Sequence, residues 1–174
     1  MEYLSKEVYI FDIDGCIMPS IFNEMNFFIY FLKKVNKLNK RADQTQLYPS
    51  FVKYYEKNCK EAELVVFLTG RKHSEFGDVT RRQLKRLQKF KNFRLIFYPE
   101  QKNHQLKEYL KWKTQNILHI ITNKIANERI EKIIEYNFKI FDDNGRYFKE
   151  LKKITEELPV TLSFSQVYGE NCWC

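Results

Sequence analysis

The stretch Val8-Tyr9-Ile10-Phe11-Asp12-Ile13-Asp14-Gly15 decides the fold that we expect of this chain. An apolar and aromatic run leads directly into two acids, a pattern typical of a buried strand with an abrupt end. Because side chains alternate along a strand, Asp12 and Asp14 leave it on the same face, about 7 Å apart. Gly15 then allows a sharp turn where a side chain would clash. The pattern predicts a central strand that presents two carboxylates at its carboxyl end.

Two carboxylates so close together repel each other, and this repulsion can be relieved in two ways. A hard cation such as Mg²⁺ would neutralise Asp12 and Asp14 and could also hold a phosphate. The alternative is a surface turn at which water solvates both acids. A single Asp-x-Asp does not separate these interpretations, so the rest of the chain has to decide between them.

The composition indicates one domain over residues 1–174. A chain of 174 residues is long enough for one full core, and its apolar fraction of 44%, with 15 Phe and 11 Tyr, excludes a disordered chain. The 30 basic residues outnumber the 22 acidic ones, which gives a net charge of +8. This charge favours polyanionic partners, although many proteins carry a similar charge without binding any.

Four cysteines are too few for a disulfide framework in a chain of this size. Cys16 and Cys59 are expected to be small apolar residues of the core. Cys172-Trp173-Cys174 is either a metal-binding or oxidisable pair or an inert tail, and we favour the tail because two thiols are half a zinc site. No signal peptide is apparent, and the apolar run 27–32 is too short to cross a bilayer. We therefore expect a cytoplasmic protein with no membrane contact.

Helical and extended patterns alternate along the chain. Helices are expected over 21–40, 49–60, 79–91, 104–121, 126–136 and 146–156, although 117–121 taken alone also fits a strand. Strands are expected to lead into Asp12 and to cover 64–68, 94–98, 138–141 and 160–164. Five strands separated by helices predict an α/β fold, a Rossmann-like three-layer α/β/α arrangement around a parallel sheet of about five strands. A helical segment, 19–62, would lie between the first and second strands.

Polar clusters follow three of the five expected strands. Asp12 and Asp14 end the first strand, Thr69-Gly70-Arg71 the second, and the pair Asp142 and Asp143 follows the fourth. In open α/β sheets, ligands bind outside the carboxyl ends of the strands. Each cluster is identified without reference to the others, yet all fall on this one edge. Their coincidence is the main indication of an active site.

The three clusters together resemble the haloacid dehalogenase (HAD) superfamily of phosphotransferases, over about residues 8 to 148. The first motif of that family is matched by residues 11–15, Phe-Asp-Ile-Asp-Gly. The second is matched by Leu68-Thr69 with Gly70-Arg71 behind it, and the fourth by Phe141-Asp142-Asp143. One such motif is weak, but three in order at strand ends are specific. The resemblance implies a HAD fold and a Mg²⁺-dependent hydrolase, a phosphatase of phosphoric monoesters.

By this resemblance, Asp12 would be the nucleophile that attacks phosphorus and forms an aspartyl-phosphate. Asp14 would act as general acid towards the leaving oxygen and then as general base towards water. The Mg²⁺ ligands would be Asp12, the backbone carbonyl of Asp14 and the side chain of Asp143. Asp142 would support the ion through water.

The resemblance also implies groups that bind the transferring phosphoryl group. Thr69 would donate a hydrogen bond to it, with help from the Gly70 amide. Arg71 would either orient the substrate or cap the segment that follows, and the sequence leaves both open.

The resemblance also implies a lysine that offsets the charge of the phosphoryl group. Helical periodicity separates the candidates, because Leu106, Leu110 and Ile117 define an apolar stripe on which position 113 falls. Lys113 thus occupies a position where burial favours a hydrophobic residue, and a lysine is rarely buried without a partner. The alternative is that Lys113 extends to water from a helix end. Lys107 remains the second candidate, ahead of the other lysines in this region, Lys102 and Lys111.

The spacing of the later motifs is similar to that of the "Swiss Army knife" HAD-like domains associated with RNA repair. The likeness rests on Tyr98-Pro99, the helix with Trp112-Lys113, and residues 140–148, Ile-Phe-Asp-Asp-Asn-Gly-Arg-Tyr-Phe. This chain departs from the subgroup at two places. Asn144-Gly145 precede Arg146, and Tyr147 stands where the subgroup implies His.

The expected site has no large cap, because only 18–63 has room for one and the core fold needs one of its two helices. An open site suits a large substrate whose own body excludes water. Together with the basic segment 79–91, this favours a phosphorylated substrate such as a nucleic-acid end or a nucleotide. A solvated basic face is an equal alternative for that segment. A phosphatase of small metabolites or phosphoproteins, and a non-catalytic HAD-like binding module, are the competing functions.

Overall fold

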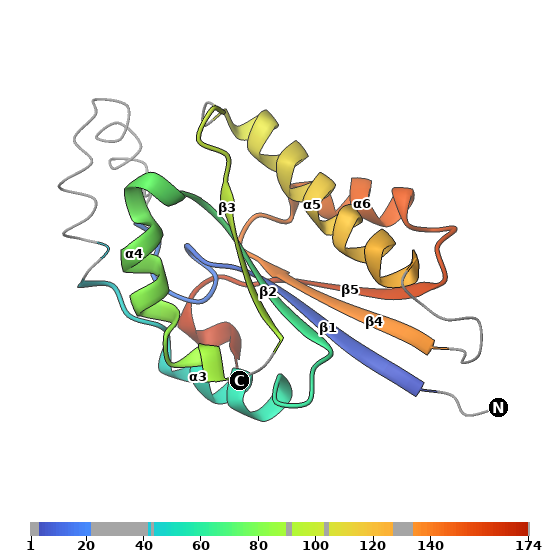
Figure 1. Cartoon of the computed structure of the whole chain (residues 1–174), viewed down its shortest axis with the longest axis horizontal. Helices are drawn as coiled ribbons and strands as arrows, with labels where there is room; N and C mark the ends of the chain where they lie inside the picture. Colours follow the sequence, from blue (N-terminus) through green and yellow to red (C-terminus); the bar gives the residue numbers. More distant parts are fainter. Residues whose placement is uncertain are drawn as a thin grey trace.

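Five parallel strands form a single sheet in the order β3-β2-β1-β4-β5 (Figure 1). The structure is a computed structural model that describes residues 4–21, 42, 44–89, 92–102, 105–126 and 134–173. The strands are β1 (Leu4–Asp12), β2 (Leu64–Lys72), β3 (Phe93–Tyr98), β4 (Ile134–Asp142) and β5 (Val160–Gln166). The predicted parallel α/β sheet is therefore confirmed, with the acidic strand β1 at its centre.

The central strand is buried on both faces, as its uniformly apolar sequence predicts. Val8 and Ile10 point to one face, and Tyr9 and Phe11 point to the other. This alternation divides the apolar core into two halves, one on each side of the sheet.

Helices cover both faces of the sheet, and α5 and α6 lie together on one side of it (Figure 1). Phe51 and Tyr55 of α3 pack on the Phe11 face, and Leu84 of α4 joins them. Ile117 and Ile121 of α5 pack on the opposite face. The four helices are α3 (Pro49–Asn58), α4 (His73–Leu84), α5 (Leu106–Ala126) and α6 (Phe148–Ile154), with short 3₁₀ turns η1 (Leu87–Lys89), η2 (Gly145–Tyr147) and η3 (Glu170–Trp173). The three-layer arrangement is as predicted.

Strand β2 is longer than expected, because it continues past Leu68 to Lys72. Thr69 still pairs with Phe97 of β3, but the next paired residue is Lys72, so the register shifts between them. A bulge of this kind re-aims the side chains of the residues that it contains. Gly70 and Arg71 therefore lie within an irregular strand end, not in a loop behind it.

The helix expected over 79–91 begins earlier and ends earlier, as α4 over His73–Leu84. Its first turn is capped by a residue distant in sequence, since the Glu100 carboxylate accepts hydrogen bonds from the Ser74 amide (2.8 Å) and hydroxyl (2.6 Å). These bonds satisfy donors that a helix start otherwise leaves open. The start of α4 could not be read from local sequence because its cap comes from the segment after β3.

The helix expected over 126–136 is wrong where the structure describes it. Ala126 is the last residue of α5, and Ile134–Tyr136 begin β4, where they pair with Leu4–Lys6 of β1. Pairing with the neighbouring strand overrides the helical spacing of the isoleucines. Residues 127–133 lie outside the described residues. Of the helix expected over 21–40, all but Ile21 also lies outside the described residues, as do residues 22–41 and 43 of the segment 19–62, where a cap would have to lie.

The remaining boundaries differ by a few residues. The helix expected over 146–156 is divided into η2 and α6, and the helices expected over 49–60 and 104–121 are α3 and α5. Among the residues that the structure describes, none of the helices combines the length and apolar character that a bilayer-spanning segment needs.

Candidate active site

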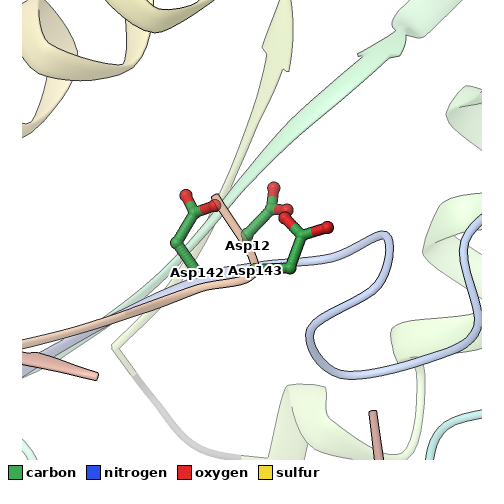
Figure 2. Close-up of side chains that lie close together, drawn as sticks. All are labelled: Asp12, Asp142 and Asp143. Carbon is green, nitrogen blue, oxygen red and sulfur yellow. The ribbon is translucent and has the colours of Figure 1, made fainter. Parts of the chain in front are cut away.

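Three carboxylates meet at the carboxyl ends of the neighbouring strands β1 and β4 (Figure 2). Asp12, Asp142 and Asp143 each place one oxygen within 4.8 Å of the other two. The register explains why, since Phe11 pairs with Phe141 and the residues that follow them are therefore level. Asp12 and Asp142 are buried, with exposed fractions of 5% and 2%. Among the described residues, this is a group of acids that could hold a metal ion.

Lys113 enters the acidic cluster from α5. Its ammonium nitrogen lies 3.0 Å from Asp12 Oδ1 and 2.5 Å from Asp142 Oδ2, and its side chain is 1% exposed. Leu110 and Ile117 of the apolar stripe pack on the sheet and carry the lysine to its carboxyl edge, whereas Leu106 at the start of the stripe is 48% exposed. Lys107, Lys111 and Lys102 are exposed. The structure thus places the first of the predicted lysines, and not the second, beside the acids.

Asp142 is held by three donors. Besides Lys113, the Tyr147 hydroxyl donates to Oδ2 (2.7 Å), and the Asn144 amide donates to Oδ1 (2.8 Å). A carboxylate with both oxygens engaged has little capacity left for direct coordination of an ion. The supporting role expected of Asp142 is compatible with this arrangement.

Two tyrosines of the site were not identified as functional from the sequence. Tyr147 appears there only as a departure from the subgroup pattern, yet it anchors Asp142. Tyr109 of α5 places its hydroxyl 3.4 Å from Asp12 Oδ1, and its ring lies against Gly70 where a side chain would begin. Tyr109 could have been identified from the sequence, because it lies one helical turn before Lys113 and therefore on the same side of the helix.

Asp14 is not part of the group of three acids and pairs with Arg71. Nε and Nη2 of Arg71 donate to the two oxygens of Asp14 at 2.9 and 2.8 Å. Nη1 donates to Thr80 (3.0 Å) and Gln83 (2.6 Å) of α4, and the guanidinium is completely buried. Of the two roles left open for Arg71, direct contact with a substrate would require it to leave these partners. Its present contacts fix Asp14.

Thr69 and Gly70 lie on the strand next to Asp12. Asp12 pairs with Leu68, so Thr69 is one residue further towards the same edge of the sheet. Thr69 is fully buried, and its Oγ1 accepts a hydrogen bond from the Arg71 amide at 3.1 Å. A hydroxyl that accepts in this way keeps its own hydrogen for donation.

Burial sets the ionisation of the cluster. It raises the pKa of the Asp12 carboxyl well above the usual range, with Lys113 opposing this shift and Asp142 adding to it. Burial, followed by repulsion from Asp142, raises the pKa of Asp143 to about 6. Burial disfavours the charged form of Lys113, but attraction to Asp12 and Asp142 outweighs it and raises its pKa. A cation placed among these carboxylates would favour their charged forms.

The charged side chains of the site carry more negative than positive charge. Arg71 neutralises Asp14, and Lys113 neutralises one of the three clustered carboxylates. Two negative charges remain when all three are ionised, which is the charge that one divalent cation would balance. Carboxylate oxygens are also the ligands that hard divalent cations prefer.

Gly15 fits against the cluster because it has no side chain. Its φ is +83°, and a Cβ at this position would lie 2.5 Å from Asp143 Oδ2. We expect Gly15→Ala to lower the free energy of unfolding by more than the roughly 1–2 kcal/mol of left-handed backbone strain alone, because it also displaces the Asp143 carboxylate. The measurement is urea denaturation.

Gly169→Ala is the matched control for this substitution. Gly169 has a similar φ of +74°, but the nearest atom to an added Cβ is the Tyr48 hydroxyl at 3.8 Å. Both variants carry backbone strain and only Gly15→Ala adds the overlap. Equal losses of stability would mean that Asp143 does not constrain position 15.

The structure thus brings Asp12, Lys113, Asp142 and Asp143 into contact, with Asp14 and Arg71 as a separate pair at the same edge. No family model, curated protein or solved structure significantly matches this chain, so what supports a function is the arrangement of these side chains.

Proposed function

We propose that this protein is a Mg²⁺-dependent phosphohydrolase of the HAD type that acts through an aspartyl-phosphate on Asp12. The observation that carries the proposal is the buried contact of Asp12 with Lys113 among three carboxylates at the carboxyl edge of the central strands. Burial of the three ionisable groups Asp12, Lys113 and Asp142 is unfavourable for stability, and such clusters are typical of functional sites. Mg²⁺ would be held by Asp12 and Asp143 and would offset the charge of a bound phosphate.

Lys113 and Tyr109 orient the proposed nucleophile. Both donate towards Oδ1 of Asp12, at 3.0 and 3.4 Å, so the plane of this carboxylate is fixed before a substrate arrives. A preorganised ammonium also stabilises the charge that spreads over the phosphoryl oxygens in the transition state. The same contact therefore serves positioning and electrostatic stabilisation.

Asp14 is the proposed general acid and base. Both of its oxygens accept bonds from Arg71, so at least one of these bonds has to break when Asp14 exchanges a proton with the leaving group or with water. The bidentate contact with Arg71 defines the position to which the Asp14 carboxylate returns after each proton transfer. Retention of this second acid favours catalysis over a pure binding module, since binding alone does not require it.

The test is hydrolysis of a generic aryl phosphate with and without Mg²⁺. We expect phosphate release that depends on the cation and stops on addition of a chelator. Absence of hydrolysis under both conditions would leave the binding module as the better description.

We further propose that the substrate is a phosphate on a nucleic-acid end or a nucleotide. A groove between α4 and residues 45–52 carries two arginines, Arg82 and Arg86, of which Arg86 also pairs with Glu56 (3.2 Å). Gln83 lines the same groove and bonds to Arg71, which holds Asp14. The groove is thus connected to the proposed general acid through two side chains. Positive charge beside the site is suited to the further phosphates of a strand.

Binding of a single-stranded oligonucleotide with a terminal phosphate is expected to weaken with salt. If Arg82 and Arg86 each neutralise one phosphate, the affinity falls roughly tenfold between 50 and 200 mM salt. Arg82→Gln should raise KM for the oligonucleotide, reduce this salt dependence and leave hydrolysis of the aryl phosphate unchanged. Lys152→Gln on α6 is the control, since it also removes an exposed positive charge, on the other side of the sheet. A response of both variants to the same extent would argue against the groove.

A further inference from the structure

The chain after β5 crosses the ends of the two strands that carry the acids. Residues 167–173, here called the C-terminal clamp, donate three hydrogen bonds to backbone carbonyls at these ends. The Val167 amide donates to Asp142 (3.0 Å), and the Gly169 amide donates to Gly15 (3.3 Å). The indole Nε1 of Trp173 donates to Cys16 (3.0 Å). The clamp therefore connects the end of β4 to the turn that follows β1.

The clamp is anchored in the core directly beneath the acidic cluster. The ring of Trp173 is 5% exposed and lies 5.8 Å from the ring of Phe11 and 5.2 Å from that of Phe141. These two residues immediately precede Asp12 and Asp142. The indole also packs against Phe51 of α3, with ring centroids 4.8 Å apart. The C-terminal tail, which we interpreted from the sequence as inert, thus contains a residue of the core.

A second anchor holds the clamp at the surface. The Ser50 hydroxyl at the start of α3 donates to the Glu170 carbonyl at 2.7 Å. Gly169, with φ +74°, supplies the turn that brings Trp173 back under Cys16. The path of the clamp is thus fixed at both ends, on α3 and on β4.

The turn after β1 is stabilised by bonds within it and by bonds from other segments, among them the Tyr48 amide, which donates to Ile17 (3.0 Å). Within it, the Gly15 amide donates to Met18 (2.9 Å), and the Ile17 amide donates to Ile13 (3.1 Å). The carbonyls of Gly15 and Cys16 accept from the clamp. Because Gly15 lies against the Asp143 carboxylate, a shift of this turn also displaces that carboxylate. Sites for metal ions tolerate shifts of only about 0.5 Å.

We propose that Trp173 is a positioning residue, which through its indole N–H and the clamp fixes the Gly15–Cys16 turn and so the spacing of Asp12, Asp14 and Asp143. This inference rests on the proposed function, since the spacing matters for holding the cation and the phosphate. A purely structural role predicts that loss of the indole N–H lowers stability alone. A positioning role predicts that it also changes the affinity for Mg²⁺ and kcat.

The test compares Trp173→Phe with Tyr55→Phe. Each removes one hydrogen bond from a buried aromatic side chain to a backbone carbonyl, and the Tyr55 hydroxyl donates to Leu87 (3.2 Å), away from the acids. We expect both variants to lose stability in urea, and Trp173→Phe to lose more because the phenyl ring fills less of the core than the indole. Only Trp173→Phe should lower kcat and weaken Mg²⁺ binding measured by calorimetry, each about tenfold, the usual size for groups that orient metal ligands. KM for the aryl phosphate should change little.

The outcomes separate the two proposals. Equal kcat and equal Mg²⁺ affinity in the two variants, with an active wild type, would overturn the role of the clamp and leave the proposed function standing. A wild type that neither binds Mg²⁺ nor hydrolyses the aryl phosphate would overturn both. If Trp173→Phe does not fold, Ser50→Ala releases the surface anchor without touching the core, and a smaller loss of Mg²⁺ affinity is expected. An unchanged affinity in that variant would also count against the clamp.

Discussion

Asp12→Asn is expected to lower hydrolysis of an aryl phosphate by on the order of 10⁴-fold or more, the size of loss seen when a nucleophile is removed. Asparagine keeps the shape of the side chain and can still contact Lys113 through its amide oxygen. It cannot form an acyl phosphate, so the covalent route is closed. The measurement is phosphate release at saturating substrate and Mg²⁺.

Loss of the nucleophile has to be distinguished from loss of a ligand to the cation. An amide oxygen is a weaker ligand than a carboxylate, so a deficit in Mg²⁺ binding should recover as the Mg²⁺ concentration increases. The missing nucleophile should not recover at any concentration. Activity of Asp12→Asn restored by high Mg²⁺ would reduce Asp12 to a metal ligand.

Glu63→Gln is the matched control for this substitution. Glu63 is also a carboxylate paired with lysine, at 2.7 Å from Lys124 and 3.3 Å from Lys6, but it precedes β2 at the opposite end of the strands. Its neutralisation should change stability slightly and leave kcat unaltered. Equal loss of activity in both variants would indicate a general effect of charge removal.

Much of the fold and part of the site followed from rules that depend on local sequence. Uniform apolar runs predicted β1 and β2, and parallel pairing then required that Asp12 and Asp142 meet at one edge. The apolar stripe of α5 favoured Lys113 over Lys107 because the phase of a helix determines which side chains face the sheet. These inferences needed only periodicity and strand topology.

The rest depended on contacts between residues far apart in the chain. Arg71 turns inward at a bulge and meets Asp14, which is 57 residues earlier, and no local pattern specifies that partner. The start of α4 depends on Glu100, and the strand at Ile134 depends on pairing with Leu4. Trp173 is the clearest case, because a residue near the end of the chain completes the core beneath the acids. Burial of a side chain is a property of the whole fold.

Lys113→Met should destabilise the protein more than any other single substitution at the site. Methionine approximates the length of the lysine stem, but it leaves Asp12 and Asp142 buried beside each other without a cation. Removal of one partner from a buried ion pair typically costs about 3–5 kcal/mol. We expect a loss of this size in urea denaturation at neutral pH without Mg²⁺.

The loss should depend on pH in a defined direction. Burial already raises the pKa of Asp12 while Lys113 lowers it, so removal of the lysine raises that pKa further. The folded variant then binds a proton that the unfolded chain has released, and its stability falls as pH rises above the ordinary carboxyl range. The deficit relative to wild type should therefore be smaller near pH 4 than near pH 8. A deficit that grows on acidification would contradict this reasoning.

Mg²⁺ should distinguish the role of the lysine in stability from its role in catalysis. Without the ammonium, the acidic cluster carries one more uncompensated negative charge, so Lys113→Met should bind Mg²⁺ more tightly than wild type and regain part of its stability. Its kcat should remain at least about 100-fold lower, because the cation does not replace the donor that orients Asp12. Lys107→Met, on the exposed face of the same helix, should match wild type in all three respects. The opposite pattern, with Lys107 essential and Lys113 dispensable, would mean that the buried ammonium contributes to folding only and that the phosphoryl charge is offset by a residue at the surface of α5.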